Sequence, residues 1–334
     1  MLELIDITKR FQVKTGILGS EKLTAVDKVS FTIKENETVG LVGESGCGKS
    51  TIGKCIVKLI NTDGGQIRFL GKDIAYLREK DFRRLRKDIQ MVFQNPLASF
   101  NPLFTIQQSL FDSINLHPEY KYKSHAEKRE RVAELLDMIK LPYDFAEKRP
   151  HELSGGQLQR IGIARVLAPK PRFVFLDEPT SALDMSIRGQ IVNLLLDLQD
   201  VYKVSYLFIT HDLRVIYFMA DRVLVMYLGQ IVETGSKDMI FHNPLHPYTH
   251  GLLAATLIGR DEQQGVRHIS RLKGELVKQR EDDATGCKLY RRCGYATSEC
   301  KEPQEMREVG KDHWVRCWRA EGLQLKTRIF DMNL

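Results

Sequence analysis

The beginning of the chain alternates between apolar and polar residues. Residues 2–7 and 29–33 show this alternation most clearly. Because successive side chains of a strand point to opposite faces, a period of two predicts antiparallel strands with one buried face. Residues 14–24 are expected to form a hairpin loop, and residues 67–72 another hairpin strand.

Farther along the chain, the apolar residues form unbroken runs. Residues 38–42 and 173–176 are two such runs, and their length suits strands that are covered on both faces, as in a parallel sheet. Residues 126–139 instead carry apolar residues at helical spacing, within a charged region at about 103–160 that we expect to be helical. Parallel strands that alternate with helices predict an α/β fold.

The residues after the first apolar run match the phosphate-binding pattern G-x-x-x-x-G-K-[ST] and lead into a segment of helical periodicity. Glycines let the backbone N–H groups turn toward a phosphate, and the start of a helix adds a partial positive charge. Lys49 is expected to reach the β- and γ-phosphates of ATP, and the Ser50 hydroxyl to bind Mg²⁺. A glycine-rich turn that matches by chance is the alternative. The predicted ATP-binding residues of this loop are Gly43, Glu44, Ser45, Gly46, Cys47, Gly48, Lys49, Ser50 and Thr51.

Two carboxylates end the second apolar run. Asp177 and Glu178 directly follow it, and ligands of open α/β sheets bind beyond the carboxyl ends of the strands. Asp177 is therefore the expected Mg²⁺ partner, and Glu178 the expected general base that orients the attacking water. An acidic strand end without a catalytic role is the alternative.

Further short motifs, in the same order along the chain, resemble those of the ABC ATPase family. Residues 153–157, Leu-Ser-Gly-Gly-Gln, resemble the family's signature. Four other residues resemble its A-loop aromatic, Q-loop, D-loop and switch histidine, and they are Phe11, Gln94, Asp184 and His211. The resemblance spans about residues 1–235. It implies a P-loop NTPase cassette with a RecA-like parallel-sheet core, an antiparallel β subdomain and a helical subdomain.

The same resemblance implies that two subunits bind head to tail, with ATP between the phosphate loop of one and the signature of the other. Phe11 would stack on adenine, and Asp184 would cross the seam between subunits. Gln94 would sense Mg²⁺ and link the site to a membrane partner, and His211 would contact the γ-phosphate and help to place the water. The signature residues of the site would be Ser154, Gly155, Gly156 and Gln157, with Ser154 and Gly156 on the γ-phosphate.

Residues 236–334 extend beyond this cassette. Residues 241–253 and 91–102 are similar to ATP-binding subunits of oligopeptide and dipeptide importers, a group that includes some nickel importers, and the chain most resembles their second, F-type subunit. The resemblance implies ATP-driven import of peptides, with a second ATPase subunit as heterodimer partner, two transmembrane permeases and an extracytoplasmic substrate-binding protein. A proline-rich linker, an importer of nickel or another small solute, and a soluble ABC protein acting on nucleic acid are the alternatives.

Four of the six cysteines lie at about residues 285–320, after a polar stretch at residues 261–283 that is expected to be a linker. They are Cys287, Cys293, Cys300 and Cys317, and they include no Cys-x-x-Cys pair. Clustered thiols in an intracellular protein favour a metal over disulfides, and four thiolates can bind zinc or an iron–sulfur cluster. Related importer subunits carry a comparable tail, some of them with a [4Fe-4S] cluster, so the resemblance implies such a cluster, with Zn²⁺ or free thiols as the alternatives. Nearby bases would offset its negative charge: Lys288, Arg291, Arg292, Lys301, Arg316 and Arg319.

The composition agrees with a peripheral membrane subunit without deciding it. The 50 Lys and Arg exceed the 43 Asp and Glu by seven, and a mildly basic surface suits the negative cytoplasmic leaflet. No basic run is long enough to make nucleic acid the expected partner. The start of the chain has no signal-peptide pattern, and no stretch approaches the roughly 20 apolar residues that span a bilayer. We therefore expect a peripheral location on the cytoplasmic side of the cell membrane.

Overall fold

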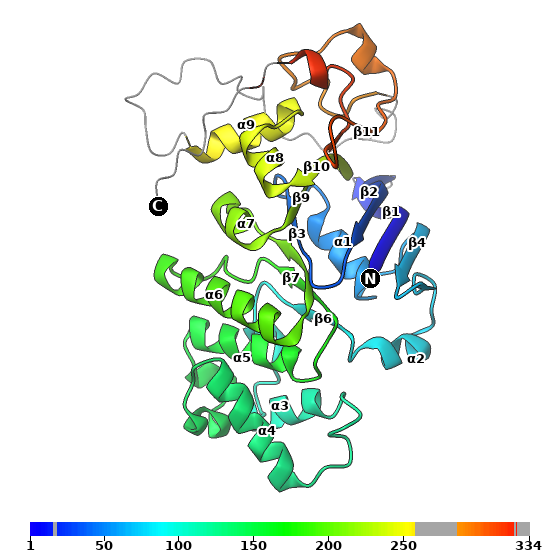
Figure 1. Cartoon of the computed structure of the whole chain (residues 1–334). Coiled ribbons are helices and arrows are strands. Elements are labelled where there is room, and N and C mark those ends of the chain that lie inside the picture. Colours follow the sequence, from blue (N-terminus) through cyan, green and yellow to red (C-terminus); the bar gives the residue numbers. More distant parts are fainter. Residues whose placement is uncertain (16–18, 258–285, 324, 326–334) are drawn as a thin grey trace. The chain divides into compact units, whose positions relative to one another are not determined.

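The computed structural model describes residues 1–15, 19–257, 286–323 and 325 (Figure 1). The chain divides into two compact units. The first comprises Met1–Thr32, Val39–Tyr76 and His211–Leu334, and the second Ile33–Thr38 and Leu77–Thr210. The predicted linker at residues 261–283 lies outside the described residues.

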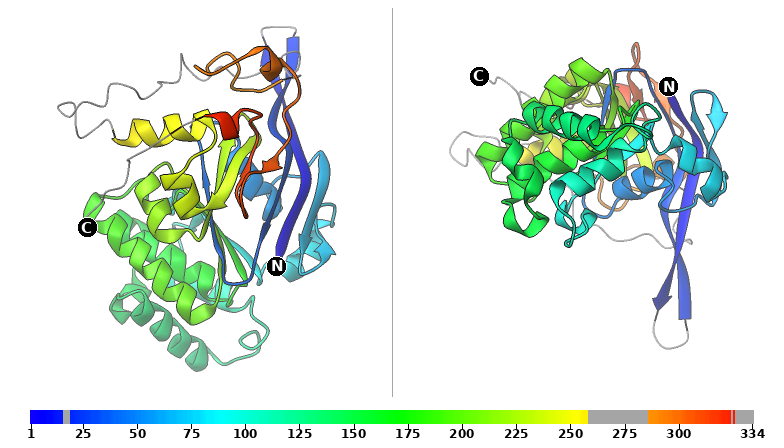
Figure 2. Two further views of the ribbon diagram at one scale, coloured as in Figure 1. Left: turned by 45° about the horizontal axis from the view of Figure 1, so that its top comes forward. Right: turned by 90° about the horizontal axis from the view of Figure 1, so that it is seen from below.

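One sheet of the first unit is antiparallel. Leu2 pairs with Phe69 and Leu4 with Ile67, and all four side chains are buried, which confirms the predicted alternation. The β1–β2 hairpin is a long two-stranded ribbon (Figure 2), and both strands extend into the predicted loop at residues 14–24. The strand order is β2-β1-β4-β5, with bounds Gly19–Ile33, Leu2–Thr15, Gly64–Phe69 and Lys72–Asp73.

The other strands of the first unit run from the core of the cassette into the C-terminal region. β3 (Thr38–Val42) is fully buried and parallel to β9 (Arg222–Tyr227), which pairs antiparallel with β10 (Gln230–Ser236). β10 then pairs with β12 (Trp314–Val315), and β12 with β11 (Arg307–Glu308). The cysteine-rich segment, defined as residues 286–323, thus continues a sheet through β11 and β12 (orange to red in Figure 1).

The helices that the structure describes in the first unit are short. They are α1 (Lys49–Ile56), α7 (Leu213–Met219), α8 (Lys237–His242) and α9 (Pro247–Leu257), with the 3₁₀ helices η6 (Ser298–Lys301) and η7 (Ala320–Gly322) in the cysteine-rich segment.

The second unit carries three parallel strands in the order β8-β7-β6. They are β6 (Ile89–Val92), β7 (Phe173–Asp177) and β8 (Ser205–Ile209). Leu176 of β7 lies beside Val92 of β6 and Phe208 of β8. Every residue of β7 and β8 is buried, which confirms that these strands are covered on both faces. The carboxyl ends of β6 and β7 meet at one edge because the two strands are parallel and in register.

Helices α3 (Ile106–Ile114), α4 (His125–Met138) and α5 (Gly155–Leu167) pack against one another in the second unit (turquoise to green in Figure 1). The predicted amphipathic helix at residues 126–139 is α4. All three begin with a capping box, in which the N-cap side chain accepts from the N–H of the third helical residue and the side chain of that residue accepts from the N-cap N–H. The remaining helices are α2 (Glu79–Phe82) and α6 (Met185–Tyr202), with η1 (Arg83–Leu85), η2 (Leu97–Ser99), η3 (Tyr143–Glu147) and η4 (Pro150–Glu152) as 3₁₀ turns.

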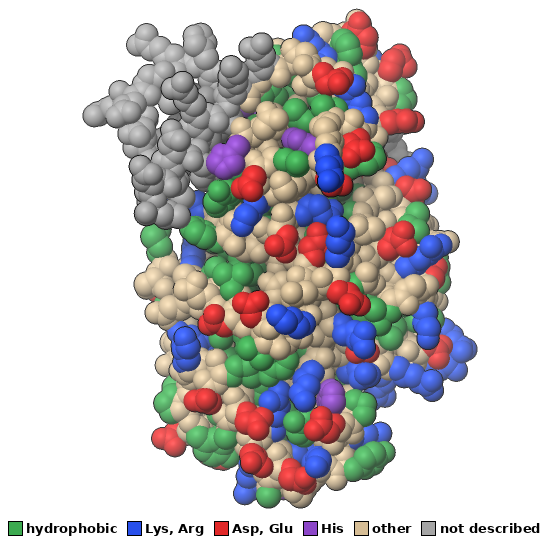
Figure 3. Space-filling view, in the orientation of Figure 1, with side chains coloured by type: hydrophobic (Ala, Val, Ile, Leu, Met, Phe, Trp, Pro, Cys, Tyr) green, Lys and Arg blue, Asp and Glu red, His purple; other side chains and the backbone are tan. Residues whose placement is uncertain are grey.

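Among the helices that the structure describes, none combines the length and the apolar character needed to cross a membrane. On the face shown in Figure 3, acidic and basic side chains are interspersed over most of the surface. This mixture reflects the near balance of 50 basic and 43 acidic residues in the whole chain.

Candidate nucleotide site

The predicted phosphate loop connects β3 to α1 in the first unit. Gly43 and Gly48 have φ angles of 153° and 112°, in the region that favours glycine. A Cβ at Gly43 would lie 2.1 Å from the Met226 carbonyl oxygen, and one at Gly48 would lie 2.2 Å from the Ala25 carbonyl oxygen. Both glycines of the pattern are therefore required by the close approach of neighbouring backbone as well as by their own conformation.

Lys49 begins α1 and turns back over the loop. Its Nζ donates hydrogen bonds to the carbonyl oxygens of Gly43 at 2.8 Å and Glu44 at 2.9 Å, and the residue is only 6% exposed. The first turn of α1 has no acidic residue and no capping side chain, so the partial positive charge of the helix start is not offset locally. Charged partners hold an ammonium more strongly than neutral carbonyls do. Lys49 is thus poised to exchange these carbonyls for a phosphate.

Cys47 has a space-filling role in this loop. Its side chain is buried, and burial raises the pKa of the thiol even though Lys49 Nζ lies 3.7 Å from Cys47 Sγ. A buried, protonated thiol fills the turn as a small neutral group.

In the second unit, the structure brings together two of the predicted catalytic residues. Gln94 Nε2 donates a hydrogen bond to Glu178 Oε2 at 3.2 Å, and Asp177 beside them is buried. Glu178 has a φ of 48°, a conformation that non-glycine residues adopt rarely and at a cost. Its backbone N–H donates to the Ile209 carbonyl oxygen at 2.9 Å, and Ser181 bonds to its carbonyl oxygen, which together hold it there. The glutamate is fixed by backbone contacts while its carboxylate accepts from an amide.

The signature begins a helix and is accessible. Ser154 is the N-cap of α5, where its Oγ accepts from the Gln157 N–H at 3.4 Å and its N–H donates to Gln157 Oε1 at 2.9 Å. Ser154 and Gly155 are exposed. Asp184, the predicted D-loop residue, is the exposed N-cap of α6 and makes no capping bond with its side chain. These residues lie at the surface of the second unit, as the predicted approach of a partner subunit requires.

The remaining predicted residues belong to the first unit. His211 is exposed and directly precedes Asp212, the N-cap of α7, whose carboxylate accepts from the Arg214 N–H at 3.0 Å. Phe11 on β1 is 38% exposed, with Lys9 Nζ 5.4 Å from its ring centroid. An exposed aromatic face beside a cation is suited to a base-stacking role.

Two residues that the sequence did not assign to the site contact the phosphate loop. Tyr248 of α9 accepts a hydrogen bond from the Glu44 N–H at 2.7 Å, and Arg292 forms a bidentate ion pair with the Glu44 carboxylate at 2.9 and 3.1 Å. The only sequence signal for Tyr248 was its place in the Pro-His-Pro-Tyr-Thr stretch, and Arg292 carried none beyond its charge.

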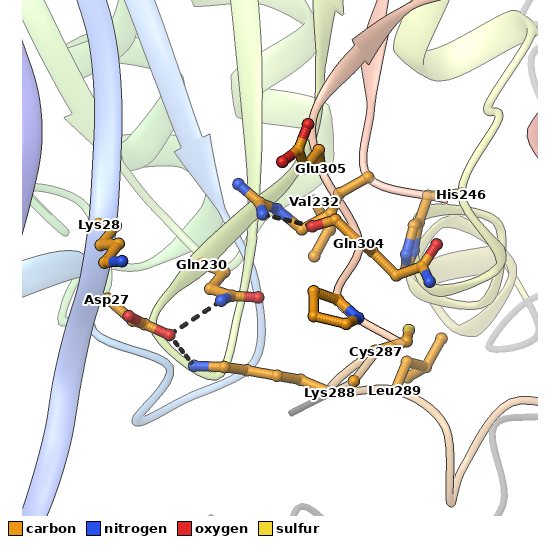
Figure 4. Close-up of a pocket in the computed structure, with 13 residues that line it drawn as sticks. Asp27, Lys28, Gln230, Val232, His246, Cys287, Lys288, Leu289, Gln304 and Glu305 are labelled. Carbon is orange, nitrogen blue, oxygen red and sulfur yellow. Dashed lines mark hydrogen bonds and ion pairs between the residues drawn. The ribbon is translucent and has the colours of Figure 1, made fainter. Parts of the chain in front are cut away.

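The cysteine-rich segment is also attached to β2 and β10 (Figure 4). Lys288 Nζ lies 2.8 Å from Asp27 Oδ2, and that same oxygen accepts from Gln230 Nε2 at 2.8 Å. These groups line a cavity of about 330 Å³ that Cys287 and His246 also border. Lys288 and Arg292 were expected to offset the charge of a metal cluster, but they pair with Asp27 and Glu44 instead.

The prediction that the four cysteines form a metal site is not supported. Among the described residues, no group of three or more Cys, His, Asp or Glu side chains is arranged to hold a metal ion. Burial raises the pKa of Cys287 to about 12, and the other cysteines add to this shift, so the Cys287 thiol favours its protonated form. Individual thiols find other partners, since Trp318 Nε1 donates to Cys300 Sγ at 3.3 Å and the Tyr295 N–H to Cys293 Sγ at 3.4 Å.

Comparison with known proteins decides the family. Residues 26–181 match the ABC transporter family, and residues 232–300 match the family described as the C-terminal region of oligopeptide/dipeptide transporters. The chain is 44% identical to the oligopeptide transport ATP-binding protein AppF of Bacillus subtilis, over 95% of this chain and 96% of that one. The chain belongs to the ABC ATPase family. It is also 42% identical to the oligopeptide transport ATP-binding protein OppF of Escherichia coli, over 97% of both chains.

Solved ABC cassettes share the fold. A dimeric, post-hydrolysis structure of the ATP-binding cassette MJ0796, bound to ADP and Pi, is 32% identical with a TM-score of 0.63, and the match covers 71% of this chain and 99% of that one. The CbiO1 cassette of Clostridium perfringens is 28% identical with a TM-score of 0.61, over 72% of this chain and 90% of that one. The predicted α/β cassette fold and the ATPase class are therefore confirmed for this ABC ATPase.

Proposed function

We propose that this chain is the F-type ATP-hydrolysing subunit of an importer of dipeptides and oligopeptides. Residues 1–235 form its cassette, and residues 236–334 the extension specific to this class of importer. The assignment to peptides is supported by the match of residues 232–300 and by near-full-length similarity to two oligopeptide transport ATP-binding proteins. The subunit acts at the cytoplasmic side of the membrane with a second ATPase subunit, two permeases and an extracytoplasmic binding protein.

The hydrogen bond between Gln94 and Glu178 is the observation that carries the catalytic part of the proposal. A carboxylate held at the end of β7 can orient a water and accept its proton, and the neighbouring amide can report the state of the site to a membrane partner. The exposed signature at Ser154 contacts the nucleotide bound by the partner subunit, while His211 contacts the γ-phosphate of the nucleotide bound by this chain.

The proposed magnesium ligands offer the oxygen donors that this ion prefers. They are the Ser50 hydroxyl, the Gln94 amide oxygen and the Asp177 carboxylate, of which Asp177 is buried. Mg²⁺, when bound, offsets the negative charge of the phosphates. Lys49 supplies a further positive charge from the protein, and positioning of these groups provides most of the rate.

The test is reconstitution of the full transporter in proteoliposomes, with the companion ATPase, both permeases and the binding protein. We expect ATP turnover and uptake of a labelled peptide to depend on each other, and Glu178→Gln in this subunit to abolish both. Uptake of Ni²⁺ with no uptake of peptides would contradict the peptide assignment, and full activity without this chain would contradict the proposed role altogether.

A second proposal concerns Cys287, Cys293, Cys300 and Cys317. Four thiols within one short segment are a donor set suited to a [4Fe-4S] cluster, with Zn²⁺ as the alternative, although they do not converge as a metal-binding group among the described residues. Loading would require the thiols to give up their protons and individual partners and turn toward one centre.

Anaerobic purification followed by iron, sulfide and zinc analysis tests this proposal. A cluster predicts iron and sulfide in equal amounts and a visible absorbance that Cys293→Ser removes, with nucleotide binding retained. Protein that contains neither iron nor zinc after anaerobic preparation would contradict any metal at these cysteines.

A further inference from the structure

The phosphate loop carries an acidic side chain at its second position, which is unfavourable for a site that binds a triphosphate. Glu44 directly follows Gly43 in the loop, and its carboxylate remains partly exposed, at 26% of the side chain. The repulsion between like charges grows as the distance between them falls, and it is screened less at a partly buried loop than in open water. A carboxylate at this position therefore needs a counter-charge if the loop is to bind phosphates well.

Arg292 of the cysteine-rich segment supplies that counter-charge. Its two terminal nitrogens lie 2.9 and 3.1 Å from the two carboxylate oxygens of Glu44, and its side chain is 12% exposed. Nη1 also donates to the Tyr227 hydroxyl at 3.3 Å, and the guanidinium lies 5.7 Å from the centre of that ring. A planar guanidinium meets a carboxylate through two parallel hydrogen bonds, which an ammonium cannot do. The hydrogen bond to Glu44 raises the pKa of Arg292 further, so its charge is permanent.

Tyr248 holds the backbone of the same residue. Its hydroxyl accepts from the Glu44 N–H at 2.7 Å, and its fully buried ring packs at 4.6 Å against that of Tyr227. Tyr227 ends β9, and the carbonyl oxygen of the preceding Met226 occupies the space that a Cβ at Gly43 would need. Glu44 is thus fixed both by an ion pair to its side chain and by a hydrogen bond to its main chain. Both partner residues lie C-terminal to the cassette motifs.

We propose that Arg292 is a positioning residue for ATP: it neutralises Glu44 beside the phosphates and, with Tyr248, fixes the first turn of the phosphate loop. The C-terminal region of this subunit thereby sets its nucleotide affinity. The inference rests on the proposed role of residues 43–51 as the ATP-binding loop.

The experiment measures equilibrium binding of a fluorescent ATP analogue to the full-length chain, together with KM and kcat of the assembled transporter. Arg292→Gln leaves Glu44 without its counter-charge, and we expect about tenfold weaker binding, equivalent to ~1.4 kcal/mol. KM should rise by a similar factor while kcat changes little, because the interaction is made equally in the ground and transition states. Glu44→Gln combined with Arg292→Gln should recover most of the lost affinity, since the charge that needed neutralising is gone.

Two further variants separate positioning from general support of the fold. Tyr248→Phe keeps the ring but removes the acceptor for the Glu44 N–H, and it should weaken binding by a few fold. Arg319→Ala is the matched control, because Arg319 lies in the same segment but donates to the Tyr295 carbonyl oxygen at 2.8 Å; its affinity should equal that of the wild type. Thermal unfolding without nucleotide checks that every variant is folded.

The proposal is overturned if Arg292→Gln binds ATP as the wild type does, or if the double variant binds no better than Arg292→Gln alone. The second result would mean that the arginine only supports the fold. Lys49→Ala tests the underlying assignment separately: if that variant kept full affinity, the loop itself would not be the ATP site.

Discussion

Replacing Glu233 by glutamine tests a buried group of hydrogen bonds that joins the C-terminal region to the cassette. Glu233 of β10 is 0% exposed. Its Oε1 accepts from the Leu245 N–H at 2.7 Å and lies 2.8 Å from His313 Nε2, and its Oε2 accepts from the His246 N–H at 2.9 Å. Two carboxylate oxygens thus serve three donors, one of them from the cysteine-rich segment.

The cost of the change follows from counting acceptors. Glutamine has one acceptor oxygen, so its NH₂ group must face at least one of the three donors, which is left without a partner. A buried donor that loses its acceptor costs about 1–3 kcal/mol, and the remaining bonds become weaker because their acceptor is no longer charged. We expect Glu233→Gln to lower the free energy of unfolding by about 2–4 kcal/mol.

Equilibrium denaturation of the nucleotide-free subunit measures this quantity. Glu308→Gln is the matched control, because Glu308 accepts from the Asp312 N–H at 2.8 Å but is exposed, so its unfolding free energy should stay within about 0.5 kcal/mol of the wild type. If Glu233→Gln were as stable as Glu308→Gln, the carboxylate could not be accepting three hydrogen bonds, and the reasoning would fail.

Three further predictions concern the site and its support. Lys49→Ala should weaken ATP binding at least about 100-fold, or roughly 2.8 kcal/mol, measured by titration calorimetry; retained affinity would contradict the phosphate-loop assignment. Glu178→Gln should slow ATP turnover about 100-fold or more and trap an ATP-bound dimer visible by size-exclusion chromatography, whereas unchanged turnover would remove Glu178 as the base. Burial lowers the pKa of His246 to about 3. Below about pH 6.5 the unfolded chain therefore binds a proton at His246 that the folded protein does not bind. Through this group alone, the free energy of unfolding should fall by up to about 1.4 kcal/mol for each unit by which the pH decreases. His246→Asn keeps an acceptor for the Tyr248 N–H, which lies 3.1 Å from His246 Nδ1, and should show a shallower loss between pH 6.5 and 5 in denaturation experiments; an equal slope would contradict this.

The local elements of the cassette were predictable from the sequence because their signals are local. Period-two alternation indicated β1 and β2, and unbroken apolar runs indicated β3 and β7. The loop between β3 and α1 was equally predictable, because the pattern G-x-x-x-x-G-K-[ST] places glycines where the backbone needs a positive φ. The meeting of Gln94 with Glu178 needed one more step, the rule that parallel strands place their carboxyl ends at one edge.

The role of the C-terminal region was decided only by tertiary structure. The sequence indicated a cysteine-rich tail with bases that would offset a metal's charge. The fold instead pairs β12 with β10 and brings Arg292 to Glu44, 248 residues apart along the chain. No local pattern encodes such a pairing, because an arginine's partner depends on which distant carboxylate the chain path brings within about 3 Å. The sequence by itself predicted which residues bind ATP, and the packing of the C-terminal region decided which distant side chains contact the predicted loop at Glu44.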